Sequence, residues 1–79
     1  MQLNVTSLKG LEYEGDIISL NIKTTAGEIT ILDNHRPLVT VLEKCAAKIT
    51  DTNGKVIEVA VNSGFLEVSP DNSVNVLID

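Results

Sequence analysis

The sequence predicts an all-β fold, an antiparallel β-sandwich or flattened barrel of about eight to ten short strands. Three observations support this prediction. The 79-residue chain contains nine valines, eight isoleucines and seven threonines, β-branched types that suit the pleated surface of a sheet. Apolar and polar residues alternate with a period of two in four segments, as in strands with one buried face. Turn-forming residues separate these segments roughly every 8–12 positions, a spacing typical of sandwiches and barrels.

The alternating segments comprise residues 2–7, 16–23, 56–62 and 73–78, and each is predicted to be a half-buried strand. Residues 38–47 come nearest to a helix, but their first half alternates and contains a threonine and two valines. We therefore predict strand for most of this segment as well. The residues predicted to face the core are Leu3, Val5, Ile18, Leu20, Ile22, Ile57, Val59, Val61, Val74, Val76 and Ile78.

Turn-forming residues mark the junctions between the predicted strands. The Asn53-Gly54 pair gives the strongest signal, because both residues tolerate positive φ. It predicts a type I′ hairpin that joins residues 47–50 to residues 55–61. Pro37 cannot donate a ladder hydrogen bond, so we expect it at the start or the edge of a strand. The other predicted turns lie at residues 9–10, 14–16, 26–27, 33–34, 62–64 and 70–72.

Composition excludes several classes of function. The net charge of −5 provides no basic surface for nucleic acid, and one tyrosine and one phenylalanine provide no stacking platform. No apolar run reaches the ~18–20 residues of a membrane span, and the N-terminal residues lack a signal-peptide pattern. One cysteine suits a reducing compartment, and with one histidine it is too few for the usual zinc ligand sets. We expect one small domain, residues 1–79, without metal or cofactor, whose thin core favours docking on a partner.

No catalytic constellation emerges from the residues alone. A serine triad needs a histidine base, and the neighbours of His35, the only candidate, indicate a turn. Cys45 lies in a strand-like apolar run, which favours a small buried role over a nucleophile. Glu12 and Glu14 flank Tyr13 and could place an acid beside a base. We favour the interpretation that both glutamates lie on a solvated strand face while Tyr13 points inward. Residues 33–37 form a predicted corner between two strands, and there His35 is expected to hydrogen-bond backbone groups that the corner leaves unpaired.

Three segments of the chain are similar to the motifs of one known family, and they follow one another in the same order and with the same spacing as in that family. Residues 13–17, Tyr-Glu-Gly-Asp-Ile, resemble aromatic-x-Gly-Glu-Val. Residues 27–38, Gly-Glu-Ile-Thr-Ile-Leu-Asp-Asn-His-Arg-Pro-Leu, resemble Gly-Glu-Ile-Gly-Ile-Leu-Pro-Asn-His-Ala-Pro-Leu. Residues 63–68, Ser-Gly-Phe-Leu-Glu-Val, resemble Gly-Gly-Phe-Leu-Glu-Val, and residues 74–77 resemble Val-Thr-Val-Leu. The chain therefore resembles the N-terminal β-sandwich domain of the ATP synthase epsilon subunit, the F1 central-stalk subunit called delta in mitochondria.

The resemblance implies a structural role without bond chemistry or cofactor. It implies binding to the gamma subunit and to the ring of c subunits, which couples ion-driven rotation to ATP synthesis at the cytoplasmic face of the cell membrane. By residue-wise correspondence, Gly27 and Glu28 match the turn that faces the c ring. His35, Pro37 and Leu38 match the corner near the gamma contact. Exposed apolar residues on one sheet face would form a gamma patch and would allow a weak homodimer of the isolated subunit.

The chain also departs from the family pattern. Most members continue into a C-terminal helical hairpin that senses ATP, whereas residues 77–79 lack the Ala-rich segment that begins it. We therefore expect a naturally short form that keeps the structural role. Two alternatives stay open: a free-standing all-β module for a peptide or small ligand, and a small enzyme that uses Glu12, Glu14 and His35. Single-residue departures, which affect expected loop shapes more than the fold, are Thr30, Asp33, Arg36, Cys45 and Ser63.

Overall fold

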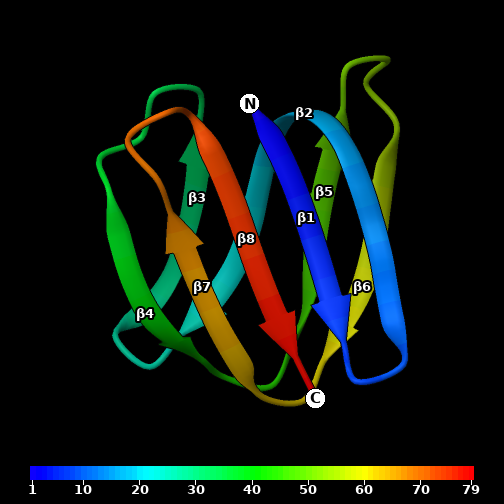
Figure 1. Ribbon diagram of the computed structural model, residues 1–79, viewed down its shortest axis with the longest axis vertical. Helices are drawn as coiled ribbons and strands as arrows, with labels where there is room; N and C mark the ends of the chain where they lie inside the picture. Colours follow the sequence, from blue (N-terminus) through cyan, green and yellow to red (C-terminus); the bar gives the residue numbers. More distant parts are fainter.

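The computed structural model describes residues 1–79 and contains eight strands and no helix (Figure 1). The predicted all-β fold is confirmed, with a strand count at the lower end of the expected range. Residues 38–47 form strand as predicted, in two strands that Glu43 and Lys44 separate. The strands are β1 (Gln2–Ser7), β2 (Gly10–Thr24), β3 (Gly27–Leu32), β4 (Leu38–Leu42), β5 (Cys45–Asp51), β6 (Val56–Val61), β7 (Gly64–Val68) and β8 (Ser73–Ile78).

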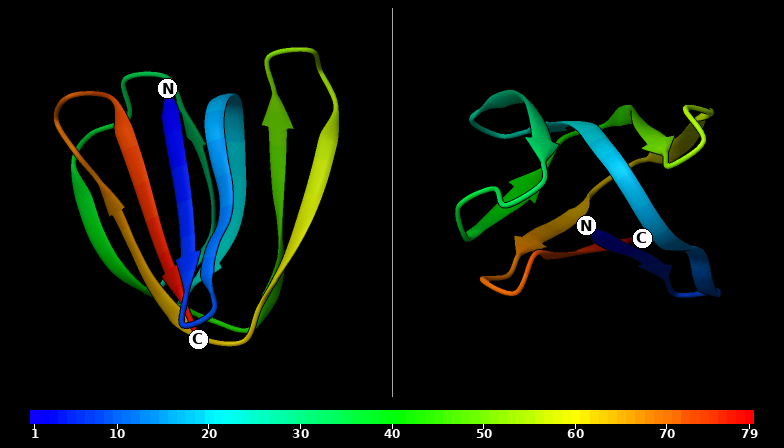
Figure 2. Two further views of the ribbon diagram at one scale, coloured as in Figure 1. Left: turned by 45° about the vertical axis from the view of Figure 1, so that its right-hand side comes forward. Right: turned by 90° about the horizontal axis from the view of Figure 1, so that it is seen from above.

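Strand β2 belongs to two sheets, which pack against each other. Its first half pairs with β1 and completes a five-stranded sheet in the order β4, β7, β8, β1, β2. Its second half pairs with β3 on one side and with β5 on the other, and β6 completes this four-stranded sheet. Thr24 at the end of β2 also pairs with Leu42 of β4, so the two layers form one continuous eight-stranded sheet. Figure 2 shows the two layers and the bent strand that joins them. All pairings are antiparallel except that of β1 with β8, so the five-stranded sheet is mixed.

The core lies between the two layers. It contains 15 buried apolar residues, which come from all eight strands and from Met1. Most of the residues predicted to face inward are buried, and Ile57, Val59 and Ile78 are half-buried against the core. Tyr13 and Cys45 also pack partly against it, in agreement with their expected structural roles. The alternation of apolar and polar residues therefore identified the buried faces of β1, β6 and β8 correctly.

The prediction that Ile18 faces the core is wrong, because the structure exposes this residue. Ile17 is 2% exposed, whereas Ile18 is 49% exposed. The register between β2 and β5 shifts between Ile17 and Ser19, so this segment contains a β-bulge. A bulge adds one residue to a strand and thereby changes which side chains point inward. Leu20 and Ile22, beyond the bulge, are buried as predicted.

Two turn predictions are also wrong. Residues 14–16 continue β2, because Gly15 pairs with Leu3 of β1 and this long-range pairing overrides the local turn preference. At the β5–β6 connection only Gly54 has positive φ, 82°, so the turn is not type I′. The Gly54 N–H donates to the Asp51 carbonyl at 3.0 Å, which fits a type I turn followed by a left-handed glycine.

Candidate functional site

The β2–β3 hairpin carries the first pair of predicted site residues, Gly27 and Glu28. Gly27 has a φ of 125°, a conformation that favours glycine. The buried Thr24 hydroxyl donates to the Gly27 carbonyl at 2.8 Å and accepts from the Ala26 N–H at 3.1 Å. The Glu28 carboxylate is exposed and forms no ion pair, and the Asn21 amide donates to it at 3.3 Å. Lys23 lies opposite Glu28 in register without forming an ion pair, so a rigid turn presents the Glu28 carboxylate to solvent.

The β3–β4 corner carries the second set. Asn34 has a φ of 60°, and the His35 N–H donates to the Leu32 carbonyl at 3.1 Å. This is the geometry of a type II turn, which accepts Asn at its third position. The His35 ring lies with Nδ1 2.8 Å from the Arg36 carbonyl, as expected for a corner histidine. Because a carbonyl oxygen only accepts, Nδ1 donates and Nε2 stays free to bind a partner.

The residues that follow the corner divide between the core and the surface. Pro37 directly precedes β4, as predicted for a residue that cannot join a ladder. Leu38 is half-buried against the core, whereas Val39 is 73% exposed. The Glu28 turn and the His35 corner lie at opposite ends of β3, about 16 Å apart for a strand of this length (Figure 1). The structure therefore does not bring the two predicted contact sets together.

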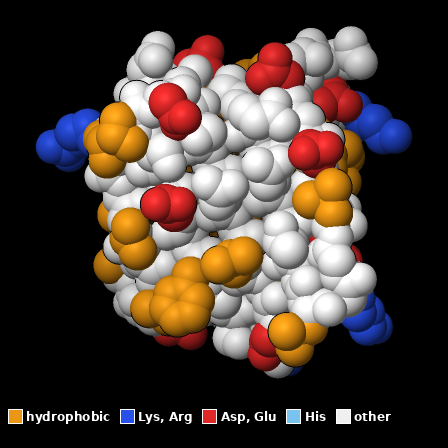
Figure 3. All heavy atoms as spheres, viewed as in Figure 1, with side chains coloured by type: hydrophobic (Ala, Val, Ile, Leu, Met, Phe, Trp, Pro, Cys, Tyr) orange, Lys and Arg blue, Asp and Glu red, His pale blue; other side chains and the backbone are white.

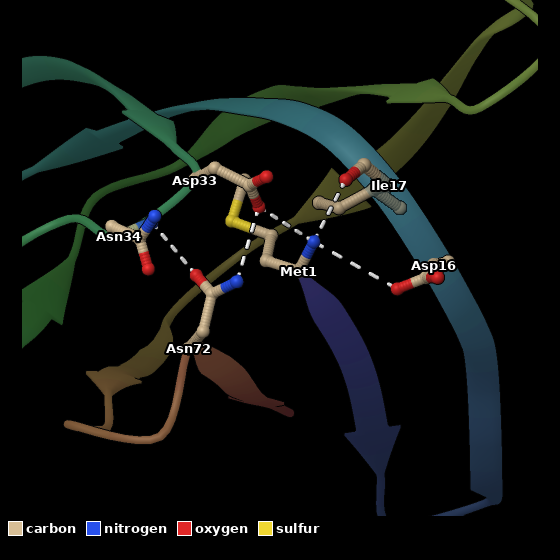
Figure 4. A network of polar contacts seen from close by, with 6 residues as sticks. All are labelled: Met1, Asp16, Ile17, Asp33, Asn34 and Asn72. Atoms are coloured by element: carbon tan, nitrogen blue, oxygen red, sulfur yellow. Dashed lines mark hydrogen bonds and ion pairs between the residues drawn. The ribbon is translucent and has the colours of Figure 1, made fainter.

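A polar network around the Met1 α-ammonium fixes the corner, as Figure 4 shows. The ammonium lies 2.8 Å from Asp33 Oδ1 and 3.7 Å from Asp16 Oδ1, and it donates to the Ile17 carbonyl at 3.3 Å. The hydrogen bond to Asp33 raises the pKa of the Met1 amine above 8.0, the charges of Asp33 and Asp16 add to this effect, and burial opposes it. The same hydrogen bond lowers the pKa of Asp33 below 3.8, with the Asn72 amide contributing.

Asn72, in the β7–β8 turn, joins the same network. Its amide nitrogen donates to Asp33 at 3.2 Å, and its amide oxygen accepts from the Asn34 N–H at 2.8 Å. Three separate segments therefore hold the conformation of the corner that carries His35. Sequence reasoning missed this network, because the Met1–Asp33 and Asp33–Asn72 contacts join residues 32 and 39 positions apart. Only two signals of this network are present in the sequence. Asp33 stands where the family pattern has a proline, and residues 70–72 are predicted to form a turn.

We expect Asp33→Asn to flatten the dependence of folding stability on pH. The Met1 contribution is fully present below pH 8.0 and is lost as the pH rises through the raised folded-state pKa. The Asp33 contribution is present above pH 3.8 and is lost as the pH falls through the lowered pKa. Urea unfolding of both proteins across the two pH windows measures the difference. Glu67→Gln, which removes an exposed carboxylate that forms no ion pair, should keep the wild-type slopes. Equal slopes for Asp33→Asn and wild type would contradict the ion pair.

The candidate enzymatic residues do not converge. Glu12 is the extra residue of a bulge opposite β1, and its carboxylate accepts from the Ser7 hydroxyl at 3.0 Å. Glu14 is exposed on β2, and His35 lies in the β3–β4 corner. No three His, Cys, Asp or Glu side chains gather closely enough to hold a metal ion. Because all its regular elements are strands, the structure has no helical segment that could span a membrane.

The whole chain, residues 1–79, matches the family described as ATP synthase, Delta/Epsilon chain, beta-sandwich domain. The chain belongs to this family. The resemblance inferred from residues 13–17, 27–38 and 63–68 is thereby confirmed. An ATP synthase epsilon chain of Halalkalibacterium halodurans is 40% identical over 72 residues, which cover 90% of this chain and 53% of that protein. This delta/epsilon-type chain thus spans about half the length of the relatives it matches.

Solved structures show the same fold. A chain in the cryo-EM structure of the Euglena gracilis mitochondrial ATP synthase, OSCP/F1/c-ring in rotational state 1, superposes with a TM-score of 0.90 at 21% identity. That match covers 96% of this chain and 48% of the other. A chain of the Tetrahymena thermophila mitochondrial ATP synthase central stalk and c-ring superposes with a TM-score of 0.83 at 14% identity, covering 99% of this chain and 62% of the other. At these identities the likeness shows the fold of this delta/epsilon-type chain.

Proposed function

We propose that this chain is a non-catalytic subunit of the central stalk of an F-type ATP synthase. It binds the gamma subunit and the ring of c subunits and couples ion-driven rotation to ATP synthesis, as a peripheral protein at the cytoplasmic face of the inner membrane. The observation that carries the proposal is the family match over residues 1–79. The two solved assemblies that contain a chain of this fold, one with F1 and the c-ring and one of a central stalk and c-ring, support it.

The two ends of β3 suit two partners. The Gly27–Glu28 turn presents an exposed carboxylate that forms no ion pair, which fits the proposed contact with cationic loops of the c ring. The His35 corner presents a ring with a free Nε2, held by backbone contacts and by the Met1 network, which fits the proposed gamma contact. Pro37 fixes the entry into β4, and Leu38 anchors the corner to the core. A rigid two-layer body between two contacts can transmit torque.

Binding measurements with purified gamma and with the c ring test the proposal. The wild-type chain should form a stable complex with gamma at micromolar concentration, and this complex should associate with the ring. Glu28→Gln should weaken ring association about three- to tenfold and leave gamma binding unchanged. His35→Ala should do the reverse. Glu58→Gln, an exposed carboxylate on β6, is the matched control and should change neither. Failure of the wild-type chain to bind gamma would contradict the proposed function.

A further inference from the structure

The Asn53-Gly54 pair lies at the tip of the β5–β6 hairpin and belongs to neither of the proposed contacts. Both residues are exposed, and no heavy atom lies within 4 Å of the position that a Cβ on Gly54 would occupy. Figure 3 shows this tip at the upper right, where it projects beyond the packed body with uncharged polar side chains and backbone at its surface. The rest of the fold therefore leaves the Asn53 side chain and the Gly54 backbone uncovered.

An exposed Asn-Gly pair can react with itself, because the backbone nitrogen of the glycine can reach the side chain of the asparagine. The Gly54 nitrogen loses its proton to hydroxide and attacks the carbonyl carbon of the Asn53 side chain. The new C–N bond closes a five-membered succinimide, and the side-chain nitrogen takes a proton from water and leaves as ammonia. Addition of water to either carbonyl of the ring then gives aspartate or isoaspartate. Glycine favours the ring closure because it has no Cβ beside the attacking nitrogen and its backbone adapts readily.

Asp51 holds the turn in a conformation that opposes this reaction. Its Oδ1 accepts hydrogen bonds from the Asn53 N–H and the Lys55 N–H, each at 2.9 Å. Its backbone carbonyl accepts from the Gly54 N–H at 3.0 Å. The nitrogen that must attack is therefore a hydrogen-bond donor, and its proton is held between Gly54 and Asp51. The reaction has to wait until the turn opens locally and releases this N–H group.

The other six asparagines of the chain lack this combination of features. Each is followed by a residue with a side chain, which hinders the approach of the backbone nitrogen. Asn62, for example, is exposed but precedes Ser63. The Asn72 amide is also held in place, by its hydrogen bonds with the Asp33 carboxylate and the Asn34 N–H. Asn53 is therefore the asparagine whose modification the structure controls through a turn.

We propose that Asn53 is a covalent modification site, where the side-chain amide converts through a succinimide to aspartate or isoaspartate, and that Asp51 gates the conversion. The proposal does not depend on the proposed function. Either product places a new carboxylate two residues from Asp51, and repulsion between the like charges weakens the hydrogen bonds of the turn. The β2–β3 hairpin, which carries Glu28, lies at the opposite end of the molecule (Figure 1). The modification therefore loosens the β5–β6 tip and leaves the Glu28 turn intact.

Peptide mapping of the whole protein during incubation at mildly alkaline pH tests the proposal. Trypsin cleaves after Lys48 and Lys55 and releases residues 49–55, in which mass spectrometry distinguishes the acid from the amide. Asn53 of the folded wild-type protein should convert at least about tenfold more slowly than in the same chain unfolded in urea. Asp51→Ala should accelerate the conversion in the folded protein at least about fivefold, because two hydrogen bonds to a carboxylate are lost. Asp51→Asn, which keeps an acceptor oxygen, should stay within about threefold of wild type.

The matched control is Asp71→Ala, which removes a carboxylate from the β7–β8 turn, where it accepts from the Ser73 hydroxyl. It should leave the conversion of Asn53 within about twofold of wild type, because the β5–β6 turn keeps all its hydrogen bonds. Thermal unfolding verifies that every variant is folded. Equal acceleration by Asp51→Ala and Asp71→Ala would reflect a general loss of stability and would overturn the gate, as would equal rates for wild type with and without urea. If Asn53 in urea converts no faster than Asn62, the assignment of the site is wrong.

Discussion

Gly64→Ala is expected to destabilise the protein by about 3 kcal/mol, at the upper end of the range for overpacked sites. A Cβ on Gly64 would collide with the backbone carbonyl oxygen of Leu77 and would lie 3.0 Å from the Leu77 carbonyl carbon and 3.1 Å from Ile78 Cα. These atoms are backbone, so no side-chain rotation relieves the collision, and β7 must move away from β8. In a domain of this size that loss lowers the melting temperature by about 12 °C or more. Thermal unfolding followed by circular dichroism measures the effect.

The matched control is Gly15→Ala, also in a strand. Its Cβ would meet only the Tyr13 side chain, at 3.5–3.8 Å, which is ordinary van der Waals contact. We expect a change within about 0.5 kcal/mol, because the backbone there is one that alanine can adopt. Equal losses for the two variants would show that β7 and β8 do not approach as the structure has them.

The parts of the fold that depend on neighbouring residues could be predicted from the sequence. Alternation alone identified the buried sides of β1 and β8, where Leu3, Val5, Val74 and Val76 are buried. The β3–β4 corner could also be predicted, because Asn34 supplies the left-handed turn residue and Pro37 sets the start of the following strand. In each case the residues that decide the conformation lie within a few positions of one another.

Features that depend on pairing between distant segments could not be predicted. The Met1–Asp33 ion pair joins the N-terminus to the β3–β4 corner, and either residue alone gives no local signal. The exposed apolar residues Val41, Phe65 and Leu77 become neighbours only once β4, β7 and β8 are in register. For the same reason the sequence could predict an apolar patch on one face but not its residues.

The structure and a strict alternation of buried and exposed residues predict opposite stability losses for substitutions at Ile17 and Ile18. The structure buries Ile17 in the core and exposes Ile18, so Ile17→Ala should cost about 2–5 kcal/mol and Ile18→Ala less than about 1 kcal/mol. Strict alternation, which places Ile18 with Leu20 and Ile22, predicts the opposite order. The two substitutions delete the same atoms from adjacent positions of one strand, so differences in propensity largely cancel.

Urea unfolding of both variants measures these two free energies. A large loss for Ile17→Ala alone would establish the bulge between Ile17 and Ser19 in solution. A large loss for Ile18→Ala alone would mean that β2 pairs with β5 without the bulge. The order of the two losses matters for function as well, because the bulge lies where β2 passes from one sheet to the other. A strand without it would turn every side chain on one side of this point to the opposite face. Either the part of β2 that carries Glu14 or the hairpin that presents Glu28 would then be inverted, so the proposed contact of Glu28 depends on the bulge.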